Sequence, residues 1–186
     1  MADKYDEITR WSYEEFEAVY EPQDASAWRS LRGDTVLERA LRNVSPAALV
    51  AIATRLLDDG ADAAVVTRVE QVNVLHLLFS QKRHDFDLEA PLLERLLDAG
   101  ADPNLVSPVW GTPLQMLNRQ GKFSDAELAP FYDVVFARPG IDLLKPGDQG
   151  RSSLQSARLA GPRRSGLRER MEAYLTEHGQ TVPPAD

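Results

Sequence analysis

The chain of 186 residues is 43% hydrophobic and 27% charged, the profile of an ordinary globular protein. Its formal net charge of −8 argues against non-specific binding to nucleic acid or to anionic membranes, and it favours a basic partner. The absence of cysteine excludes disulfides, thiolate chemistry and Cys-ligated zinc.

Two features of the chain bear on its location. Residues 1–11 are acidic and contain no apolar run, so they do not resemble a secretory signal. No stretch approaches the ~20 uninterrupted apolar residues that a transmembrane helix needs. We therefore expect a soluble, cytoplasmic protein without a membrane partner.

Residues 1–31 are predicted to form an N-terminal helical cap. Ser12 and Glu15 have the spacing of a capping box, which marks the start of a helix. A second short helix is expected near residues 25–31, with Trp28 facing inward. An acidic arm that contacts a basic partner is the alternative interpretation of this segment. The first helix would have an apolar face made of Trp11, Phe16, Val19 and Tyr20.

Four helix pairs are predicted to follow. Their inner helices are expected at 35–43, 73–81, 112–119 and 152–160, and their outer helices at 46–59, 88–99, 125–137 and 166–177. Ser45 and Ser165 are the expected N-caps of the first and last outer helices, and Ser124 with Glu127 forms a capping box for the third. Pro130 is expected to kink or restart that third helix.

The last outer helix is predicted to place Arg164, among other charged residues, on a polar outer face. Such a face would suit a C-terminal cap. Residues 180–186 contain two prolines and are predicted to form a flexible, frayed tail.

The clearest unit lies between Pro91 and Leu114. Pro91 suits a first helical turn, because its missing N–H is not needed there. Gly100 can adopt the left-handed conformation that ends a helix, and Thr112 is a plausible N-cap for the next helix. The helix between them has a stripe of four leucines: Leu92, Leu93, Leu96 and Leu97.

This unit recurs at intervals of about forty residues. The segment from Leu56 to Asp62 nearly copies the segment from Leu96 to Asp102, and Gly60 and Gly100 are 40 apart (100 − 60). A weaker third copy, Pro-Gly-Ile-Asp, contains Gly140. A fixed period in this range predicts stacked helical repeats. The leucines near the inner-helix starts step by 38, 39 and 40, at Leu37, Leu75, Leu114 and Leu154.

The Thr-Pro-Leu start and the Leu-Leu-x-x-Gly-Ala-Asp end resemble those of ankyrin repeats over roughly residues 32–179. The spacing exceeds the ~33 residues usual in that family, and the extra length falls at 80–88 and 120–125. His76 is the only histidine at its position, where Gln115 and Gln155 stand in other copies. The resemblance implies an all-α solenoid with hairpin fingers and four repeats: 32–62, 68–102, 107–142 and 147–179.

Residues suited to catalysis or metal binding are scarce. His84, Asp85 and Asp87 could be imagined as a metal site, but no second ligand pair supports it. We expect a solvated charged loop there, and a structural role for His76. No phosphate-binding loop, serine nucleophile or carboxylate pair is found. We therefore predict no catalytic residue, no cofactor and no metal.

In proteins similar to this one, partners bind along the finger tips and the inner helices. Trp110 replaces the loop glycine of the usual pattern, and it is either tucked under its neighbour or exposed as a binding anchor. Carried over by position, the resemblance implies that the partner-binding residues are Arg68, Val69, Glu70, Ser80, Gln81, Pro108, Val109, Trp110, Arg119, Gln120, Asp148, Gln149, Arg151 and Arg158.

The expected function is non-catalytic protein binding by a monomer or a heterodimer. A narrower expectation is a bacterial immunity protein that blocks a cognate toxin, by analogy with ankyrin-like proteins of this size. One alternative is a general scaffold or regulator of an endogenous partner. Another is an enzyme without a recognisable motif, which would need a deep pocket with several perturbed ionisable groups.

Overall fold

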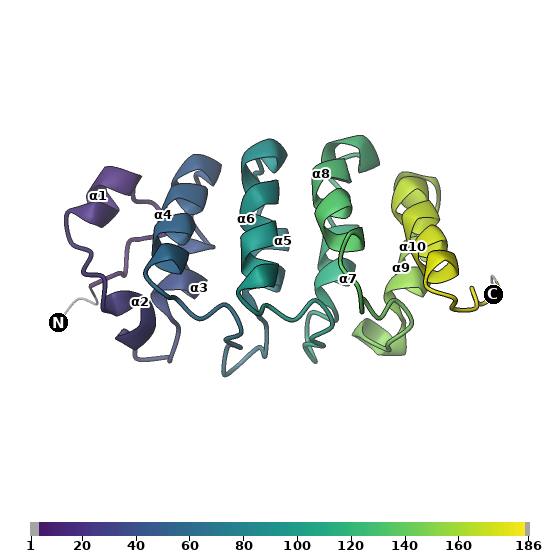
Figure 1. The fold of residues 1–186 in the computed structure, drawn as a ribbon, viewed down its shortest axis with the longest axis horizontal. Helices are drawn as coiled ribbons and strands as arrows, with labels where there is room; N and C mark the ends of the chain where they lie inside the picture. The colour runs from purple at the N-terminus through teal and green to yellow at the C-terminus, as the bar shows by residue number, and fades with distance from the viewer. Residues whose placement is uncertain (1–3, 185–186) are drawn as a thin grey trace. The chain divides into compact units, whose positions relative to one another are not determined.

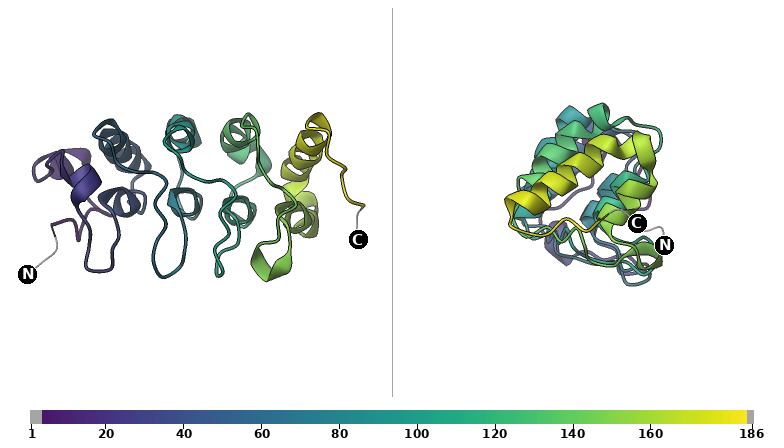
Figure 2. Two further views of the ribbon diagram at one scale, coloured as in Figure 1. Left: turned by 60° about the horizontal axis from the view of Figure 1, so that its bottom comes forward. Right: turned by 90° about the vertical axis from the view of Figure 1, so that its right-hand side faces the viewer.

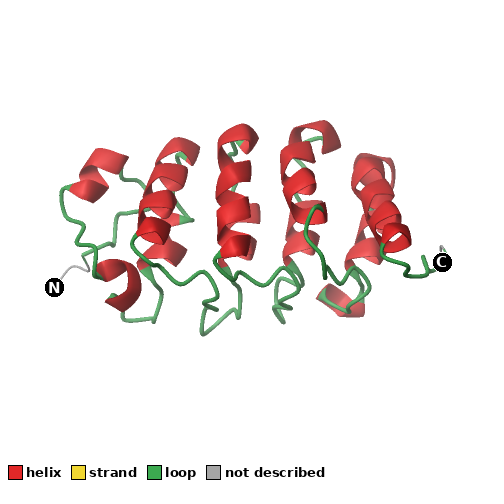
Figure 3. Ribbon diagram, in the orientation of Figure 1, coloured by secondary structure: helices red, strands yellow, loops and turns green. Residues whose placement is uncertain are grey.

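The computed structural model describes residues 4–184, which form ten α-helices, two short 3₁₀ helices and no β-strand (Figures 1 and 3). The predicted all-α class is confirmed. The chain divides into two compact units, with the boundary between residues 102 and 103. In the described part of the chain, no helix is long and apolar enough to cross a membrane.

The first unit contains two stacked helix pairs behind an N-terminal segment. The inner helix α3 packs against α4, and the next inner helix α5 packs against α6. The two pairs lie side by side through α4 with α6 and α3 with α5 (Figure 2). The helices of this unit are α1 (Tyr13–Glu17), α2 (Asp24–Ala27), α3 (Val36–Ala40), α4 (Pro46–Asp58), α5 (Val74–Phe79) and α6 (Phe86–Asp98).

The second unit has the same kind of arrangement. Its inner helices α7 and α9 contact each other, as do its outer helices α8 and α10. Buried Leu117, Phe131 and Leu167 belong to its core. The helices are α7 (Pro113–Asn118), α8 (Asp125–Phe136), the 3₁₀ helix η1 (Asp148–Gly150), α9 (Ser153–Leu159), the 3₁₀ helix η2 (Gly161–Arg164) and α10 (Ser165–Glu177).

All four inner helices begin with the same reciprocal hydrogen bonds. The N-cap side chain accepts from the backbone N–H of the third helical residue, whose side chain accepts from the N-cap N–H. Carboxylate, imidazole and amide groups all offer the required acceptor, so histidine and glutamine are interchangeable here. The N-caps are Thr35, Asn73, Thr112 and Ser152, and the third helical residues are Glu38, His76, Gln115 and Gln155.

The ends of α4 and α6 repeat as closely as the starts of the inner helices. Gly60 and Gly100 have φ values of 85° and 97°, a conformation that glycine adopts without steric cost. The residue after each glycine donates to the carbonyl five positions earlier, and Ala61 N to Leu56 O is 2.9 Å. The end of α10 uses the same bond at Gly179, a copy that the sequence comparison missed.

The weaker copy around Gly140 ends α8 in another way. The Tyr174 hydroxyl donates to the carbonyl of Arg138 (2.9 Å) and accepts from the N–H of Ile141 (3.0 Å). A side chain from α10 therefore completes the turn that backbone bonds complete elsewhere. This explains how Pro139 can replace the usual helix-ending residues.

The N-terminal segment is organised around Tyr5 rather than around the predicted helix face. Val19 is exposed, contrary to the prediction, whereas Tyr5 and Ile8 are fully buried. The Tyr5 ring packs edge-on against Trp28, with centroids 5.1 Å apart. The Asn43 amide holds this segment on α3 by donating to the carbonyl of Ile8 at 2.7 Å.

Prolines lie inside two of the outer helices. α6 begins at Phe86, with Asp85 as its N-cap, so Pro91 lies in mid-helix and faces solvent. α8 continues through Pro130, so the predicted restart is wrong. Buried Leu128 and Phe131 on either side of Pro130 hold both halves of the helix against the core, which offsets the lost hydrogen bond.

Arg164 is fully buried, although the sequence predicted an outer position for it. Its guanidinium donates to the carbonyl oxygens of Asn118 (3.1 Å), Phe123 (3.0 Å) and Gln120, and it pairs with Asp125 (3.3 Å). Arg164 therefore satisfies the carbonyl groups that follow α7. Ser165 does not cap α10, and the Asp125 carboxylate accepts from Gly166 N instead (2.7 Å).

Replacing Arg164 with methionine should destabilise the protein by about 3 kcal/mol or more, because several carbonyl groups and the half-buried Asp125 carboxylate lose their donor. Urea unfolding measures the change. Arg168→Met is the matched control, since Arg168 is partly exposed and pairs only with its neighbour Glu169. We expect a loss below about 1 kcal/mol for the control. Similar small losses in both variants would contradict the role of Arg164.

Candidate functional site

Four hairpin fingers project from the helices, each leading into an inner helix (Figure 2). A backbone hydrogen bond of 2.8–2.9 Å closes each finger, and the third finger has a second one from Gly111 N to Ser107 O. The first two fingers belong to the first unit and the last two to the second. The closing bonds run from Ser30 N to Asp34 O, Thr67 N to Val72 O, Ser107 N to Gly111 O, and Gly147 N to Arg151 O.

The sequence prediction missed the first finger. It extended a helix to residue 31, but α2 ends at Ala27 and Leu31 lies fully exposed at a finger tip. Leu31 and Arg32 therefore join the candidate residues. A usable signal was present, because Gly33 stands two residues before the Thr35 cap and Leu31 is 38 residues before Val69 (69 − 31).

The candidate residues of the first unit lie at two ends of α5. Arg68 and Val69 are exposed at the tip of the second finger, and Glu70 beside them is half-buried. Ser80 and Gln81 follow the other end of the helix and line a hollow of about 430 Å³. The Gln81 amide donates to the carbonyls of Leu41 (2.8 Å) and Leu77 (2.9 Å), so it joins the ends of α3 and α5.

In the second unit, the structure brings together Trp110, Arg119 and Asp148. The Arg119 guanidinium donates to the Trp110 carbonyl at 3.2 Å and pairs with Asp148 at 2.6 Å. Arg119 therefore joins the third and fourth fingers. Trp110 is half-buried, between the two positions that the sequence left open, while Pro108 and Val109 beside it are exposed.

The remaining candidates are engaged in contacts of their own. Arg151 donates to Gln149 within the fourth finger, and the Gln120 carbonyl accepts from Arg164. Arg158 pairs with Glu172 at 2.9 Å. It also donates to the carbonyl oxygens of Pro183 (2.8 Å) and Pro184 (2.9 Å). The end of the described chain therefore lies against Arg158.

Gln115 connects α7 to the fourth finger, a role the sequence did not suggest. Its side-chain oxygen accepts from the N–H groups of Thr112 and Asp148, both at 2.9 Å. Its side-chain nitrogen donates to the Arg151 carbonyl and the Ser156 hydroxyl, both at 2.9 Å. A polar residue at the third helical position was the available signal, but its partners in the fourth finger and in α9 lie more than thirty residues away.

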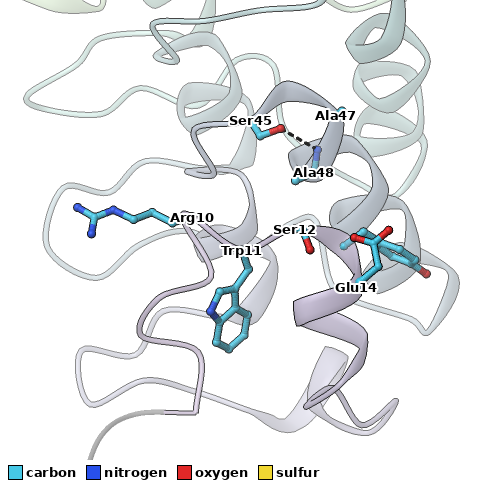
Figure 4. A pocket seen from close by; sticks show the side chains of 8 residues that line it. Arg10, Trp11, Ser12, Glu14, Ser45, Ala47 and Ala48 are labelled. Carbon is cyan, nitrogen blue, oxygen red and sulfur yellow. Dashed lines mark hydrogen bonds between the residues drawn. The ribbon is translucent and has the colours of Figure 1, made fainter.

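A hollow of about 370 Å³ lies near the N-terminus, beside the start of α4 (Figure 4). Trp11 lies in it, whereas Arg10 extends away from the other labelled side chains. The hydroxyl of Ser45 accepts from Ala48 N at 3.4 Å, and that of Ser12 accepts from Glu15 N at 3.2 Å. The polar groups of this hollow therefore serve as helix caps.

The sequence predicted a solvated charged loop at His84, and this prediction is wrong for the His84 side chain. Its side chain is buried, bonds to the Glu89 carboxylate at 2.6 Å and stacks on Phe86. The other Glu89 oxygen accepts from Asp85 N at 2.9 Å, so the pair secures the start of α6. Within residues 4–184, no group of three or more His, Asp and Glu side chains could hold a metal ion.

The comparisons show similarity of fold only. No protein-family model and no curated protein matches the sequence. Among solved structures, the chain is similar to a functionally unknown protein from Leptotrichia buccalis C-1013-b, with a TM-score of 0.74 and 20% identity over 96% of both chains. That bacterial protein shares the all-helical architecture, and the likeness assigns no activity.

Glu38 allows a test of the inner-helix cap by pH. Its carboxylate is buried and accepts from Thr35 N at 2.6 Å, and burial raises its pKa above the usual value. The folded state therefore binds this proton more tightly than the unfolded state, so stability is lost as pH rises above about 4.5. Glu38→Gln should be more stable than the parent at pH 7, with the difference shrinking toward pH 4.

Glu127→Gln is the control, and its effect on stability at pH 7 should be opposite to that of Glu38→Gln. Hydrogen bonds from the Ser124 backbone N–H and hydroxyl lower the pKa of Glu127, so its contribution is present at neutral pH and lost on acidification. This variant should be less stable than the parent at pH 7. Urea unfolding at several pH values measures both differences, and equal signs for the two variants would contradict the assignment.

Proposed function

We propose that this chain is a protein-binding module without catalytic activity, in which the helix pairs form an ankyrin-like solenoid and the fingers present the binding face. The repetition of the inner-helix caps and finger-closing bonds in both units supports this arrangement. The binding face would combine finger tips with the neighbouring inner-helix surface.

The observation that carries the proposal is an exposed aliphatic residue at the tips of three fingers. Val69 is 83% exposed and Val109 is 63% exposed, and Leu31 is fully exposed. They are separated by 38 (69 − 31) and 40 (109 − 69) residues, so they recur with the repeats. Single exposed aliphatic residues are ordinary. Their recurrence at one structural position is typical of a partner-binding surface.

The ionisable groups support a non-catalytic role. Burial raises the pKa of Tyr5, Tyr20, Tyr132 and Glu38. Each of these groups hydrogen-bonds inside its own packing environment, as Tyr5 does with Asp24 and Tyr132 with Asp125. These perturbed groups serve packing and capping rather than gathering around one cavity.

The narrower proposal is an immunity protein that binds and blocks a basic bacterial toxin. The net charge of −8 would speed association with a positively charged partner. The free protein would be a monomer and the complex a heterodimer. A general scaffold for an endogenous partner remains the alternative, and both functions use the same face.

Co-expression with the products of neighbouring genes, followed by affinity purification and size-exclusion chromatography, tests the proposal. The expected result is a one-to-one complex with a basic protein that arrests growth when expressed alone. A stable complex with a harmless partner would favour the scaffold. Failure to bind any protein would contradict both functions.

Val69→Asp and Val109→Asp should each weaken partner binding by about tenfold or more, because each introduces a charge where an apolar contact is expected. Their unfolding midpoints should stay unchanged, since both side chains are exposed. Leu88→Asp is the control, because Leu88 is an exposed leucine on the outer helix α6. Loss of binding in the control alone would place the binding face on the outer helices.

A further inference from the structure

A small hollow in the first unit lies between the first finger, the second finger and the end of α3. Its volume is about 160 Å³. Arginine residues from all three elements line it, together with two acids and the exposed Val69. The arginines are Arg32 on the first finger, Arg68 on the second and Arg42 after α3. We call this set the arginine hollow.

Three other arginines of the same unit pair with carboxylates. Arg39 pairs with Asp6 at 3.3 Å, Arg55 with Asp59 at 3.2 Å and Arg95 with Asp58 at 2.6 Å. Across residues 4–184, Arg32, Arg42 and Arg68 form no ion pair or side-chain hydrogen bond with another described residue.

The Asp34 side chain of the hollow is engaged elsewhere. The Asp34 carboxylate lies 3.9 Å from Arg39 Nε and accepts from the Ser30 hydroxyl at 3.3 Å, so it is directed toward its own finger. Three positive groups then face two acids in a chain whose net charge is −8. Like charges around one small hollow repel each other, and an anion bound between them would remove that cost.

Packing holds Arg68 across the hollow. Gly33 of the first finger has φ 89°, and a Cβ atom placed on it would lie 2.9 Å from Arg68 Nε. The Arg68 side chain therefore lies directly over the backbone of the neighbouring finger. This contact places the Arg68 side chain against the first finger.

We infer that the arginine hollow binds an acidic side chain on an extended segment of the protein partner. Guanidinium groups match the planar geometry of a carboxylate, and charge-assisted bonds to them are strong. The volume suits one carboxylate-bearing side chain with a few waters, at ~30 Å³ for each water. Val69 would contact the aliphatic part of the same segment.

The inference rests on the proposed protein-binding function and adds a specific feature to it. A basic partner would approach the acidic chain through long-range attraction. Its acidic segment would then fit the arginine hollow, whose lining carries three arginines and two acids. A positive hollow on an acidic protein, matched by an acidic segment on a basic partner, would set the register of the complex. If the partner were shifted along the surface, groups of like charge would face each other.

The test is an NMR titration of the full-length ¹⁵N-labelled protein with a capped hexaglutamate peptide at low salt. We expect saturable shifts of the Nε–H resonances of Arg32, Arg42 and Arg68. Arg68→Gln should weaken binding at least fivefold, and the Arg42→Gln, Arg68→Gln double variant should abolish saturation. Arg163→Gln is the matched control, since Arg163 is exposed, belongs to the second unit and lies outside the arginine hollow.

Several outcomes would overturn the inference. Equal weakening by Arg163→Gln would mean that the peptide binds by net charge alone. Saturable binding of inorganic phosphate without binding of the peptide would assign the hollow to a different ligand.

If Val69→Asp reduces partner binding while Arg68→Gln changes neither the binding of the peptide nor that of the partner, the hollow has no such role and the protein-binding function stands. If the peptide binds the hollow but no protein partner exists, the protein-binding proposal fails instead.

Discussion

The structure depends on the reciprocal hydrogen bonds at the start of each inner helix. These helices contain only five to seven residues, fewer than an isolated helix needs to be stable in water. Each cap satisfies two backbone donors that would otherwise be buried without partners. The N-cap residue is also the last residue of a finger or directly follows it. The same bonds therefore set the direction in which each finger leaves the helices.

The third helical residue shows how one position can serve different local needs. Glu38 offers a carboxylate in a buried place, and burial raises its pKa. Gln115 supplies the same acceptor oxygen but has an amide nitrogen in addition, which reaches the Arg151 carbonyl. The amide thus connects neighbouring repeats in a way that a carboxylate cannot. Arg164 performs a related task at the other end of α7, where carbonyl groups need donors.

Fingers with buried, hydrogen-bonded bases and exposed tips would suit a binding protein. Buried polar groups hold the finger bases, so the tips need contribute little to folding and can carry exposed residues such as Val69 and Val109. A tip held by a rigid base loses little conformational entropy when a partner binds. In the ankyrin-like arrangement that we propose, apolar tips and the arginine hollow would act together. The apolar groups would supply contact area, and the charges would select the register.

The sequence by itself determined the all-α class, the forty-residue period and most helix boundaries, because capping residues, glycines and leucine stripes act over short distances. The resemblance to ankyrin repeats, carried over by position, implied that Val69 and Val109 lie on fingers. Tertiary structure alone decided the burial of Tyr5 and Arg164 and the partners of Gln115. Those features depend on contacts between residues twenty or more positions apart, which no local pattern encodes. The arginine hollow belongs to this second group, since its three charges come from separate elements and become neighbours only when the fingers and α3 pack together.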